Sequence, residues 1–453
     1  MKKDMSLQDT RFTNLRAVVV KLTSRCNIKC EYCYEDITFG KEKHYYLPID
    51  DFELLIDKML TNSRQHQITI IFHGGEPSLL PISWLDRACE FSYASALRNN
   101  KSIEISMQTN FINISDDLMN CFKRNNIALG VSIDNPQDVT QSMRPLADKV
   151  IKNYFRAKEN GVNCGILMTI NQSNAHMFNK ICNWLYADMG ALSFKANVAY
   201  PVGAGVNLPP PTPSEIFKAK KDIIDYMIET KAECATEYHV TESMIHYVEC
   251  HLKGVQRSQS LCDYEGCGAG TEVIGITPEG NILPCGRFSW NEKEYFLGHL
   301  KDKTVDFKIA YDKKLKRFFS IAPENWQDCG SCEARAICRF SCQAFIARST
   351  LKANIECEAT KMEFSYLDSI KESVVQIYPK LKLRSSLGSL LGKFGLEQIR
   401  KEKSENFRAL RPFLENLFML DLERKSNSKI GNDEFLMLIN YLEHTIQNSD
   451  ITG

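Results

Sequence analysis

Apolar and polar positions alternate in blocks along the amino-terminal part of the chain. The block Ala17 to Val20 is rich in β-branched residues and contains no polar position, which is typical of a parallel strand covered on both faces. Apolar residues then repeat at helical spacing, at Phe52, Leu55, Ile56, Met59 and Leu60. Asp50, with Glu53 three residues later, predicts a capping box for this helix. The first blocks therefore predict a strand followed by a helix.

The strand-then-helix pattern repeats further along the chain. Apolar blocks predict strands at Ile68 to Phe72, Ile103 to Met107, Ala128 to Ile133, Cys164 to Ile170 and Leu192 to Tyr200. Amphipathic segments predict helices near Trp84 to Leu97, Ser115 to Arg124, Lys149 to Asn160 and His176 to Met189. Such alternation predicts a parallel sheet with right-handed crossovers. We expect an α/β fold with a partial (β/α)6 TIM-like barrel and an active site at the carboxyl ends of its strands.

The second half of the chain has a different pattern. It predicts a helix at Thr241 to Lys253 and a small hairpin whose strands are Val273 to Ile276 and Ile282 to Cys285. Later amphipathic stretches lie near Lys361 to Ile377, Phe407 to Leu422 and Asp433 to Ile446. We expect three units: the barrel at residues 1–235, a small cysteine-rich α+β domain at 236–358 and a helical extension at 359–453.

Composition and charge exclude several classes of protein. The chain has 453 residues, with 56 Lys plus Arg and 56 Asp plus Glu, so no basic surplus indicates nucleic-acid binding. It contains no signal-peptide pattern and no apolar run long enough to span a membrane, so we expect a cytoplasmic enzyme without a membrane partner. Its 17 cysteines are then better interpreted as metal ligands or buried thiols than as disulfides.

Three cysteines follow the first predicted strand directly. Cys26, Cys30 and Cys33 have the spacing C-x3-C-x2-C, which directs three thiolates toward one point and leaves a fourth position of a metal cluster open. An open position provides a place for a substrate. The alternative is a structural zinc site, for which His44 is the nearby fourth candidate.

Polar motifs follow the next strands. Gly74 and Gly75, before Glu76 and Pro77, allow backbone to approach a ligand closely, and their carbonyls with the Glu76 carboxylate can accept hydrogen bonds from an ammonium group. Polar side chains at the ends of the following two strands are Gln108, Thr109, Asn110, Ser132 and Asp134. All these motifs lie where a barrel places its active site.

A second set of cysteines surrounds and follows the hairpin. These are Cys262, Cys267, Cys285, Cys329, Cys332, Cys338, Cys342 and Cys357. Eight cysteines are enough for two fully ligated [4Fe–4S] clusters. The alternative is a zinc ribbon on Cys329, Cys332, Cys338 and Cys342, which leaves the other four without a role.

The first motif, with Tyr32 before its third cysteine, resembles the signature of radical S-adenosylmethionine (SAM) enzymes. The resemblance implies a [4Fe–4S] cluster on Cys26, Cys30 and Cys33, whose open iron binds the amino and carboxylate groups of SAM. It also implies that Arg144 pairs with the SAM carboxylate. The SAM-binding residues it implies are Tyr32, Gly74, Gly75, Glu76, Gln108, Asn110, Ser132, Asp134 and Arg144.

The spacing from Cys267 through Gly280 to Cys285, with the later cysteines, resembles the SPASM domain of radical SAM peptide and protein maturases. The resemblance implies two auxiliary [4Fe–4S] clusters, and thus three clusters together with SAM. It assigns the first auxiliary cluster to Cys262, Cys267, Cys285 and Cys342. It assigns the second to Cys329, Cys332, Cys338 and Cys357.

The resemblance also implies the chemistry. The reduced three-cysteine cluster cleaves SAM, and the 5′-deoxyadenosyl radical takes a hydrogen atom from a substrate carbon. A small flavodoxin- or ferredoxin-type protein would supply the electron. We expect a peptide maturase that installs an oxidative C–C or C–O crosslink, involving an aromatic residue, in a ribosomally made precursor peptide (RiPP).

Two alternatives remain open. Sulfatase-maturing enzymes, which convert Cys or Ser to formylglycine, share this layout but carry a basic Asp directly after the cysteine that matches Cys285, where this chain has Gly286. A non-catalytic iron–sulfur protein would have no use for a SAM pocket.

The catalytic base is not identified by any motif. The candidates near the cluster motifs are Asp263, Glu265, Arg287 and His299. Since about fourteen residues precede the first strand, we expect leader recognition by the barrel mouth, the carboxyl-terminal helices or a separate protein.

Overall fold

A computed structural model gives the arrangement of most of the chain. It describes residues 10–35, 44–136, 143–257, 262–263, 266–303, 309, 311–316, 327–349, 351 and 354–394, without the side chains at 262, 263, 266, 327, 383 and 386–394. No helix in these ranges is long and apolar enough to cross a membrane.

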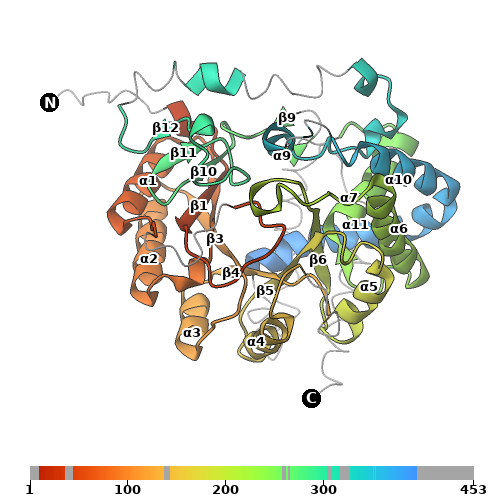
Figure 1. Cartoon of the computed structure of the whole chain (residues 1–453), viewed down its shortest axis with the longest axis horizontal. Coiled ribbons are helices and arrows are strands. Elements are labelled where there is room, and N and C mark those ends of the chain that lie inside the picture. The colour runs from red at the N-terminus through yellow and green to blue at the C-terminus, as the bar shows by residue number, and fades with distance from the viewer. Residues whose placement is uncertain are drawn as a thin grey trace.

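Six parallel strands form the centre of the molecule and confirm the predicted α/β barrel (Figure 1). They are β1 (Ala17–Thr23), β2 (Gln67–Gly74), β3 (Ser102–Thr109), β4 (Ala128–Ser132), β5 (Cys164–Ile170) and β6 (Ser193–Val198). Each strand pairs with the next in chain order. Their carboxyl ends therefore meet at one rim of the barrel.

Helices surround the six strands and bury the outer face of the barrel sheet (Figure 1). They are α1 (Ile49–Asn62), α2 (Ile82–Arg98), α3 (Asp116–Arg124), α4 (Ala147–Glu159), α5 (Phe178–Ala187) and α6 (Pro213–Glu229). Phe72 of β2 packs edge-on against Phe52 of α1 and Trp84 of α2. Since neighbouring strand residues face opposite ways, Lys21, His73 and Gln108 point into the barrel interior.

Two local predictions need correction. Asp50 and Glu53 do not form a capping box, because α1 begins at Ile49 and its N-cap is Pro48, which has no side-chain cap hydrogen bond. A bridge between Thr23 and Tyr46 holds the preceding chain extended, which sets the start of the helix. Helix α6 was not predicted from the sequence, although Thr212 and Glu215 form a complete capping box at its start.

The predicted hairpin is present and extends the barrel sheet. Strands β10 (Val273–Ile276), β11 (Asn281–Leu283) and β12 (Gly298–His299) join β1, and β7 (Thr236–Glu237) joins β6, which gives a ten-stranded sheet. Strand β10 runs parallel to β1 and antiparallel to β11. A separate pair is formed by β8 (Cys262–Asp263) and β9 (Gly266–Cys267). The hairpin thus contacts the first strand of the barrel directly.

The remaining described helices lie in the second half of the chain. They are α7 (Tyr238–His246), continued by a π-helix (Tyr247–Leu252), then α9 (Gln343–Arg348), α10 (Cys357–Ser369) and α11 (Lys371–Phe394). A buried ion pair joins Lys220 of α6 to Glu363 of α10 at 2.8 Å. The predicted stretches 407–422 and 433–446 lie outside the described residues. The three-unit division stays a prediction.

Short 3-10 turns complete the described chain. They lie at Thr10–Phe12, Pro77–Leu79, Gly203–Gly205, Lys293–Tyr295, Gln327–Cys329 and Glu333–Ala336.

Candidate active site

The cysteine loop is held by the backbone of the glycine pair. The N–H of Gly75 donates to the carbonyl of Thr23 at 2.7 Å, and the N–H of Glu76 donates to that of Arg25 at 2.8 Å. A Cβ at Gly75 would lie 2.1 Å from the Arg25 oxygen, and one at Gly74, whose φ is +115°, would lie 2.6 Å from the Thr23 oxygen. Only glycine allows this approach, so β2 fixes where the loop leaves β1.

The Glu76 carboxylate is fully buried and receives three hydrogen bonds. Its donors are the N–H of Ser78 at 3.0 Å, the hydroxyl of Thr109 at 2.7 Å and the N–H of Asn110 at 2.7 Å. Burial raises the pKa of Glu76, and the hydrogen bonds from Ser78, Asn110 and Thr109 oppose that shift. Glu76 therefore ties the end of β3 to the turn after β2.

The three thiols of the loop lie within this framework. Burial raises the pKa of the Cys26 thiol to about 11 and also raises the pKa values of Cys30 and Cys33. The amide of Asn110 donates to Sγ of Cys26 at 3.6 Å. Thiolates need nearby positive charge in such surroundings, which a cluster iron supplies. This chemistry fits the metal role predicted for the three cysteines.

A second group of predicted SAM residues forms one polar cluster. The phenol of Tyr32 donates to the carboxylate of Asp134, and Nε of Arg144 donates to Tyr32 at 3.1 Å and to Asp134 at 3.2 Å. The N–H of Thr169 on β5 donates to the other oxygen of Asp134 at 2.9 Å. Arg144 is half-buried beside this carboxylate. The structure thus brings Tyr32, Asp134 and Arg144 together at the rim.

A small pocket opens beside the group of Tyr32, Asp134 and Arg144. Its empty volume is about 260 Å³, and its walls come from the cysteine loop, the ends of β5 and β6 and the proline-rich turn that follows β6. The lining includes Tyr32, Asn171, Gln172, Tyr200 and Pro210. It lies on the side of the cluster nearest β6.

The barrel interior carries polar groups that no sequence motif had identified. The N–H of Gly74 donates to Nδ1 of His73 at 2.7 Å, so Nε2 carries the proton and donates to Oε1 of Gln108 at 2.8 Å. Burial lowers the pKa of His73 to about 3, and the positive charges of Lys21 and Arg287 add to the shift. The imidazole is therefore neutral at physiological pH.

Lys21 and Glu35 form a fully buried ion pair in the same interior. Lys21 also donates to the carbonyl of Phe288. Burial lowers the pKa of Lys21, and the Glu35 carboxylate opposes the shift. In the sequence, Lys21 is a single cation directly after an apolar block, and hydrophobic periodicity alone does not show that it is buried in an ion pair.

The segment after Cys285 crosses the barrel mouth. Gly286 lies against Val19, and the hydroxyl of Tyr34 donates to the Gly286 carbonyl at 3.2 Å. The guanidinium of Arg287 donates to Oδ1 of Asn197 at 3.2 Å. Arg287 thereby connects the segment over β1 to β6, the far end of the six-strand arc.

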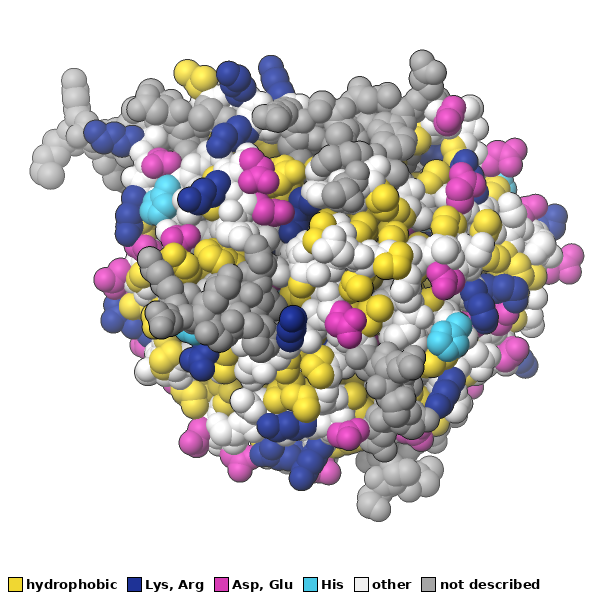
Figure 2. All heavy atoms as spheres, viewed as in Figure 1, with side chains coloured by type: hydrophobic (Ala, Val, Ile, Leu, Met, Phe, Trp, Pro, Cys, Tyr) yellow, Lys and Arg dark blue, Asp and Glu magenta, His cyan; other side chains and the backbone are white. Residues whose placement is uncertain are grey.

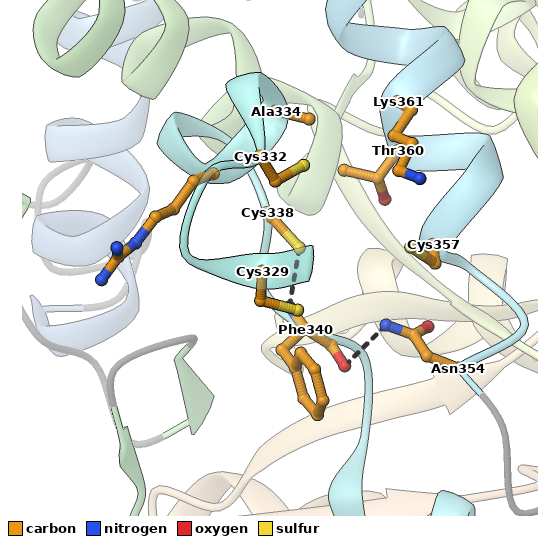
Figure 3. A pocket seen from close by; sticks show the side chains of 10 residues that line it. Cys329, Cys332, Ala334, Cys338, Phe340, Asn354, Cys357, Thr360 and Lys361 are labelled. Carbon is orange, nitrogen blue, oxygen red and sulfur yellow. Dashed lines mark hydrogen bonds between the residues drawn. The ribbon is translucent and has the colours of Figure 1, made fainter. Parts of the chain in front are cut away.

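Four of the later cysteines line one pocket. Cys329, Cys332 and Cys338 lie on one wall, and Cys357 lies at the start of α10 on the facing wall (Figure 3). The pocket has an empty volume of about 420 Å³ and further lining from Phe340, Thr360 and Lys361, among others. The N–H of Phe340 donates to Sγ of Cys338 at 3.2 Å.

The lining of the cysteine pocket differs from the set of ligands that the zinc-ribbon alternative uses. Cys342, the fourth ligand of the ribbon alternative, is absent from the lining, and Cys357 takes its place. Within the described part of the chain, no three His, Cys, Asp or Glu side chains have the geometry to hold a single metal ion. The four cysteines that line the pocket are those predicted to hold the second auxiliary cluster.

The other predicted cluster cysteines gather around a small apolar group. Cys267, Cys285 and Cys342 pack against Ala269, Leu283, Phe288 and Ala344. The side chain of Cys262 lies outside the described part, but its backbone pairs with that of Cys267 in the β8–β9 ladder. Three of the four predicted ligands thus share one neighbourhood.

The candidate bases are placed differently from one another. Arg287 reaches the barrel interior, as described above. His299 lies on the outer strand β12, where Nε2 is 2.8 Å from the carbonyl of Glu279. Glu265 and the side chain of Asp263 lie outside the described residues.

Ser132, one of the predicted SAM-binding residues, is half-buried on β4.

The family model of the radical SAM superfamily matches residues 20–185, which include Cys26, Cys30, Cys33 and the glycine pair. The chain contains a radical SAM domain. The match to this superfamily implies a [4Fe–4S] cluster and SAM, and the relatives of the chain described below are enzymes.

Two curated relatives are similar to parts of the chain. The serine-type anaerobic sulfatase-maturating enzyme of Bacteroides thetaiotaomicron is 30% identical over 170 residues, which cover 36% of this chain and 41% of that protein. The cysteine-type enzyme of Clostridium novyi is 23% identical over 355 residues, which cover 73% of this chain and 88% of that protein. The similarity to the first relative thus spans less than half of its length.

Solved structures share the fold. Native anSMEcpe with bound AdoMet superposes with a TM-score of 0.66 at 18% identity, covering 81% of this chain and 99% of that one. SuiB of Streptococcus suis bound to the precursor peptide SuiA gives a TM-score of 0.53 at 17% identity, covering 74% of both chains.

Proposed function

We propose that this protein is a radical SAM maturase that installs an oxidative crosslink in a ribosomally made precursor peptide. The observation that carries the proposal is Gly286. Sulfatase maturases are expected to carry a basic carboxylate at this position, and here a side chain would collide with Val19 of β1. SuiB, which shares the fold, binds a precursor peptide according to its structure.

The proposal includes three [4Fe–4S] clusters. Cys26, Cys30 and Cys33 hold the one that binds SAM. Cys262, Cys267, Cys285 and Cys342 hold the first auxiliary cluster, and Cys329, Cys332, Cys338 and Cys357 hold the second. The shared pocket of the last four cysteines and the common neighbourhood of Cys267, Cys285 and Cys342 support this assignment.

SAM lies, in this proposal, between the cysteine loop and the rim of β2 to β5. The carbonyls of Gly74 and Gly75 face its amino group, and Arg144 binds its carboxylate. The implied SAM set remains Tyr32, Gly74, Gly75, Glu76, Gln108, Asn110, Ser132, Asp134 and Arg144. The ion pair with Asp134 positions the guanidinium of Arg144 for this role.

The clusters supply single electrons and SAM supplies hydrogen-atom abstraction. The chain supplies position and exclusion of water. Arg287 spans the mouth from Gly286 to Asn197, and the hydrogen-bonded row of Tyr34, His73 and Gln108 fixes the polar interior. Fixed dipoles of this kind orient a reacting peptide without reorganising during the reaction. A flavodoxin- or ferredoxin-type donor and a peptide substrate are the proposed partners.

The test is a reaction under anaerobic conditions with reconstituted protein, SAM and dithionite. The proposed activity predicts 5′-deoxyadenosine, and a precursor peptide encoded beside the gene should lose two hydrogens and show altered fragmentation by mass spectrometry. Reduced protein that forms no 5′-deoxyadenosine with any peptide would contradict radical SAM catalysis and support the non-catalytic alternative.

The second candidate function is formylglycine formation. Similarity along 88% of the Clostridium novyi enzyme favours it. A peptide with a sulfatase-type Cys or Ser motif is the matched substrate. Appearance of an aldehyde on that residue, with no change in the precursor peptide, would replace the crosslinking proposal.

A further inference from the structure

A group of cationic side chains lies along the interior wall formed by β6 and α7. Lys195 and Asn197 occupy alternate positions of β6, whose intervening residues Phe194 and Ala196 face the helices. Since alternate strand residues share a face, Lys195 and Asn197 both point into the barrel. The guanidinium of Arg287 donates to Asn197 at 3.2 Å, which adds a second cation to this wall.

A third cation joins them from the loop after Cys338. The Lys195 ammonium lies 4.9 Å from the ring centre of Tyr238, and the Arg339 guanidinium lies 5.9 Å from the same centre. Nη1 of Arg339 donates to Nδ1 of His239 at 3.0 Å. Nε2 of His239 therefore carries a hydrogen and is a donor.

The electrostatics of His239 report the positive field at this wall. Burial lowers the pKa of His239 well below its usual value, and Lys195, Arg339, Lys220 and Arg287 all lower it further. Among nearby carboxylates, Glu242 forms an ion pair with Arg339. Glu237 is buried and accepts hydrogen bonds from the N–H groups of Ala196 and Val240. Burial, the larger effect, raises its pKa, and the nearby charges of Lys195 and Lys220 lower it.

We propose that this wall, defined by Lys195, Asn197, His239, Arg287 and Arg339, binds an acidic side chain of the substrate peptide. The proposal rests on the peptide-maturase function proposed above and specifies its substrate class. Guanidinium, ammonium and neutral imidazole donors together match a carboxylate, because hydrogen bonds between charged partners are the strong ones. The wall lies inside the barrel, where the field is screened less than on the surface.

On the face of the molecule shown in Figure 2, the described residues form no region that would provide this selectivity. On the face shown in Figure 2, Lys and Arg side chains alternate with Asp and Glu without a large region of either sign. The acidic residue is therefore recognised after it enters the barrel, and it fixes which neighbouring residue meets the reacting centre. An Asp or Glu near the modified residue is the expected sequence feature of the substrate.

Another explanation for two of the cations is local balance of cluster charge. In sequence, Arg339 directly follows the proposed cluster ligand Cys338, and Arg287 is two residues after Cys285. Lys195 has no proposed cluster cysteine nearby in sequence, since it lies on β6 of the barrel. A substitution of Lys195 therefore distinguishes the two explanations. Peptide recognition predicts that it changes substrate preference, and cluster charge balance predicts that it does not.

The test compares Lys195→Met with the wild-type holoenzyme on peptide pairs that differ only by Asp or Glu against Asn or Gln. The pairs come from short random peptides selected for SAM-dependent modification. Wild type should favour the acidic member by about tenfold or more. Lys195→Met should lose most of that preference, and Lys195→Arg should retain it. Lys218→Met, which removes an exposed cation from α6, is the matched control and should behave as wild type.

Iron content and peptide-independent 5′-deoxyadenosine formation are measured for every variant. Both values should stay at wild-type levels in Lys195→Met. A loss of preference for acidic peptides would then be due to peptide recognition and not to a loss of clusters or of SAM cleavage. If no peptide is modified although 5′-deoxyadenosine forms, the maturase function fails. If peptides are modified without preference for acidic residues, or if Lys195→Met loses iron while its preference is unchanged, acidic recognition at this wall is wrong.

Discussion

Gly286 lies so close to Val19 that no side chain fits between them. A Cβ at position 286 would be 2.5 Å from Cγ1 and 2.7 Å from Cβ of Val19. Val19 belongs to β1 and is β-branched, so it has little freedom to move aside. The chain has no carboxylate directly after Cys285, and Val19 leaves no room for a side chain at that position.

Gly286→Ala should lower the free energy of unfolding by about 1–3 kcal/mol, because it overpacks this contact. Val19→Ala removes Cγ1 and Cγ2 but keeps Cβ, so it should relieve part of the collision, and adding Gly286→Ala to it should cost less than adding it to the wild type. Thermal unfolding of the holoenzyme measures both effects. Gly165→Ala is the matched control, since its Cβ would have only an ordinary contact at 3.8 Å. Equal losses in the wild-type and Val19→Ala backgrounds would show that the two methyl groups of Val19 are not the obstacle.

Cys357→Ala should remove about four irons per chain, because a [4Fe–4S] cluster needs its ligands. The zinc-ribbon alternative makes the opposite prediction, since it does not use Cys357. Iron, sulfide and zinc analysis of anaerobically purified protein measures the outcome. Cys164→Ala, a half-buried cysteine of β5, is the control and should leave the metal content unchanged. Stoichiometric zinc that persists in Cys357→Ala would support the ribbon.

Arg144→Met should weaken SAM binding by about tenfold or more, which is the expected loss of a charge-assisted hydrogen bond to the SAM carboxylate. Equilibrium binding of SAM to the reconstituted protein measures the change. Arg156→Met removes an arginine of α4 that pairs with Asp116 at 2.7 Å on the outer surface, and it should bind SAM as the wild type does. If Arg144→Met binds SAM with unchanged affinity, then the guanidinium pairs with Asp134 but does not bind the SAM carboxylate.

Glu237 should make the fold less stable as the pH rises. Burial raises its pKa from 4.5 to about 7, while the N–H groups of Ala196 and Val240 oppose the shift. Between these pH values the folded state binds more protons than the unfolded state, so its stability is fully present below about pH 4.5 and falls up to about pH 7. The loss is about 3 kcal/mol.

Glu237→Gln removes the titration and should flatten this part of the pH profile. Thermal unfolding of both proteins between pH 4.5 and 8 measures the difference, and their melting temperatures should diverge with pH. Parallel profiles would show that Glu237 keeps its ordinary pKa in the folded protein.

Part of the site was predictable from the sequence because its information is local. The spacing of Cys26, Cys30 and Cys33 and the pair Gly74 and Gly75 lie on short loops directly after strands. Strand and helix periodicity then places those loops at one rim, because parallel strands connected by helices all end on the same side. The six strands and the hairpin were found in this way.

The sequence alone determined the α/β barrel, the radical SAM motif and the second group of cysteines, since each depends on periodicity or short spacing. Tertiary structure decided which distant residues meet. It brings Cys357 into one pocket with Cys329, Cys332 and Cys338, a set that only the family resemblance had implied. It also places Gly286 against Val19, and Lys195 and Arg339 at the same Tyr238 ring. It also moved the start of α1 to Ile49, because a bridge from Thr23 holds the preceding chain. Such contacts depend on sheet register and on how loops cross the barrel mouth, and neither is encoded in the spacing of neighbouring residues.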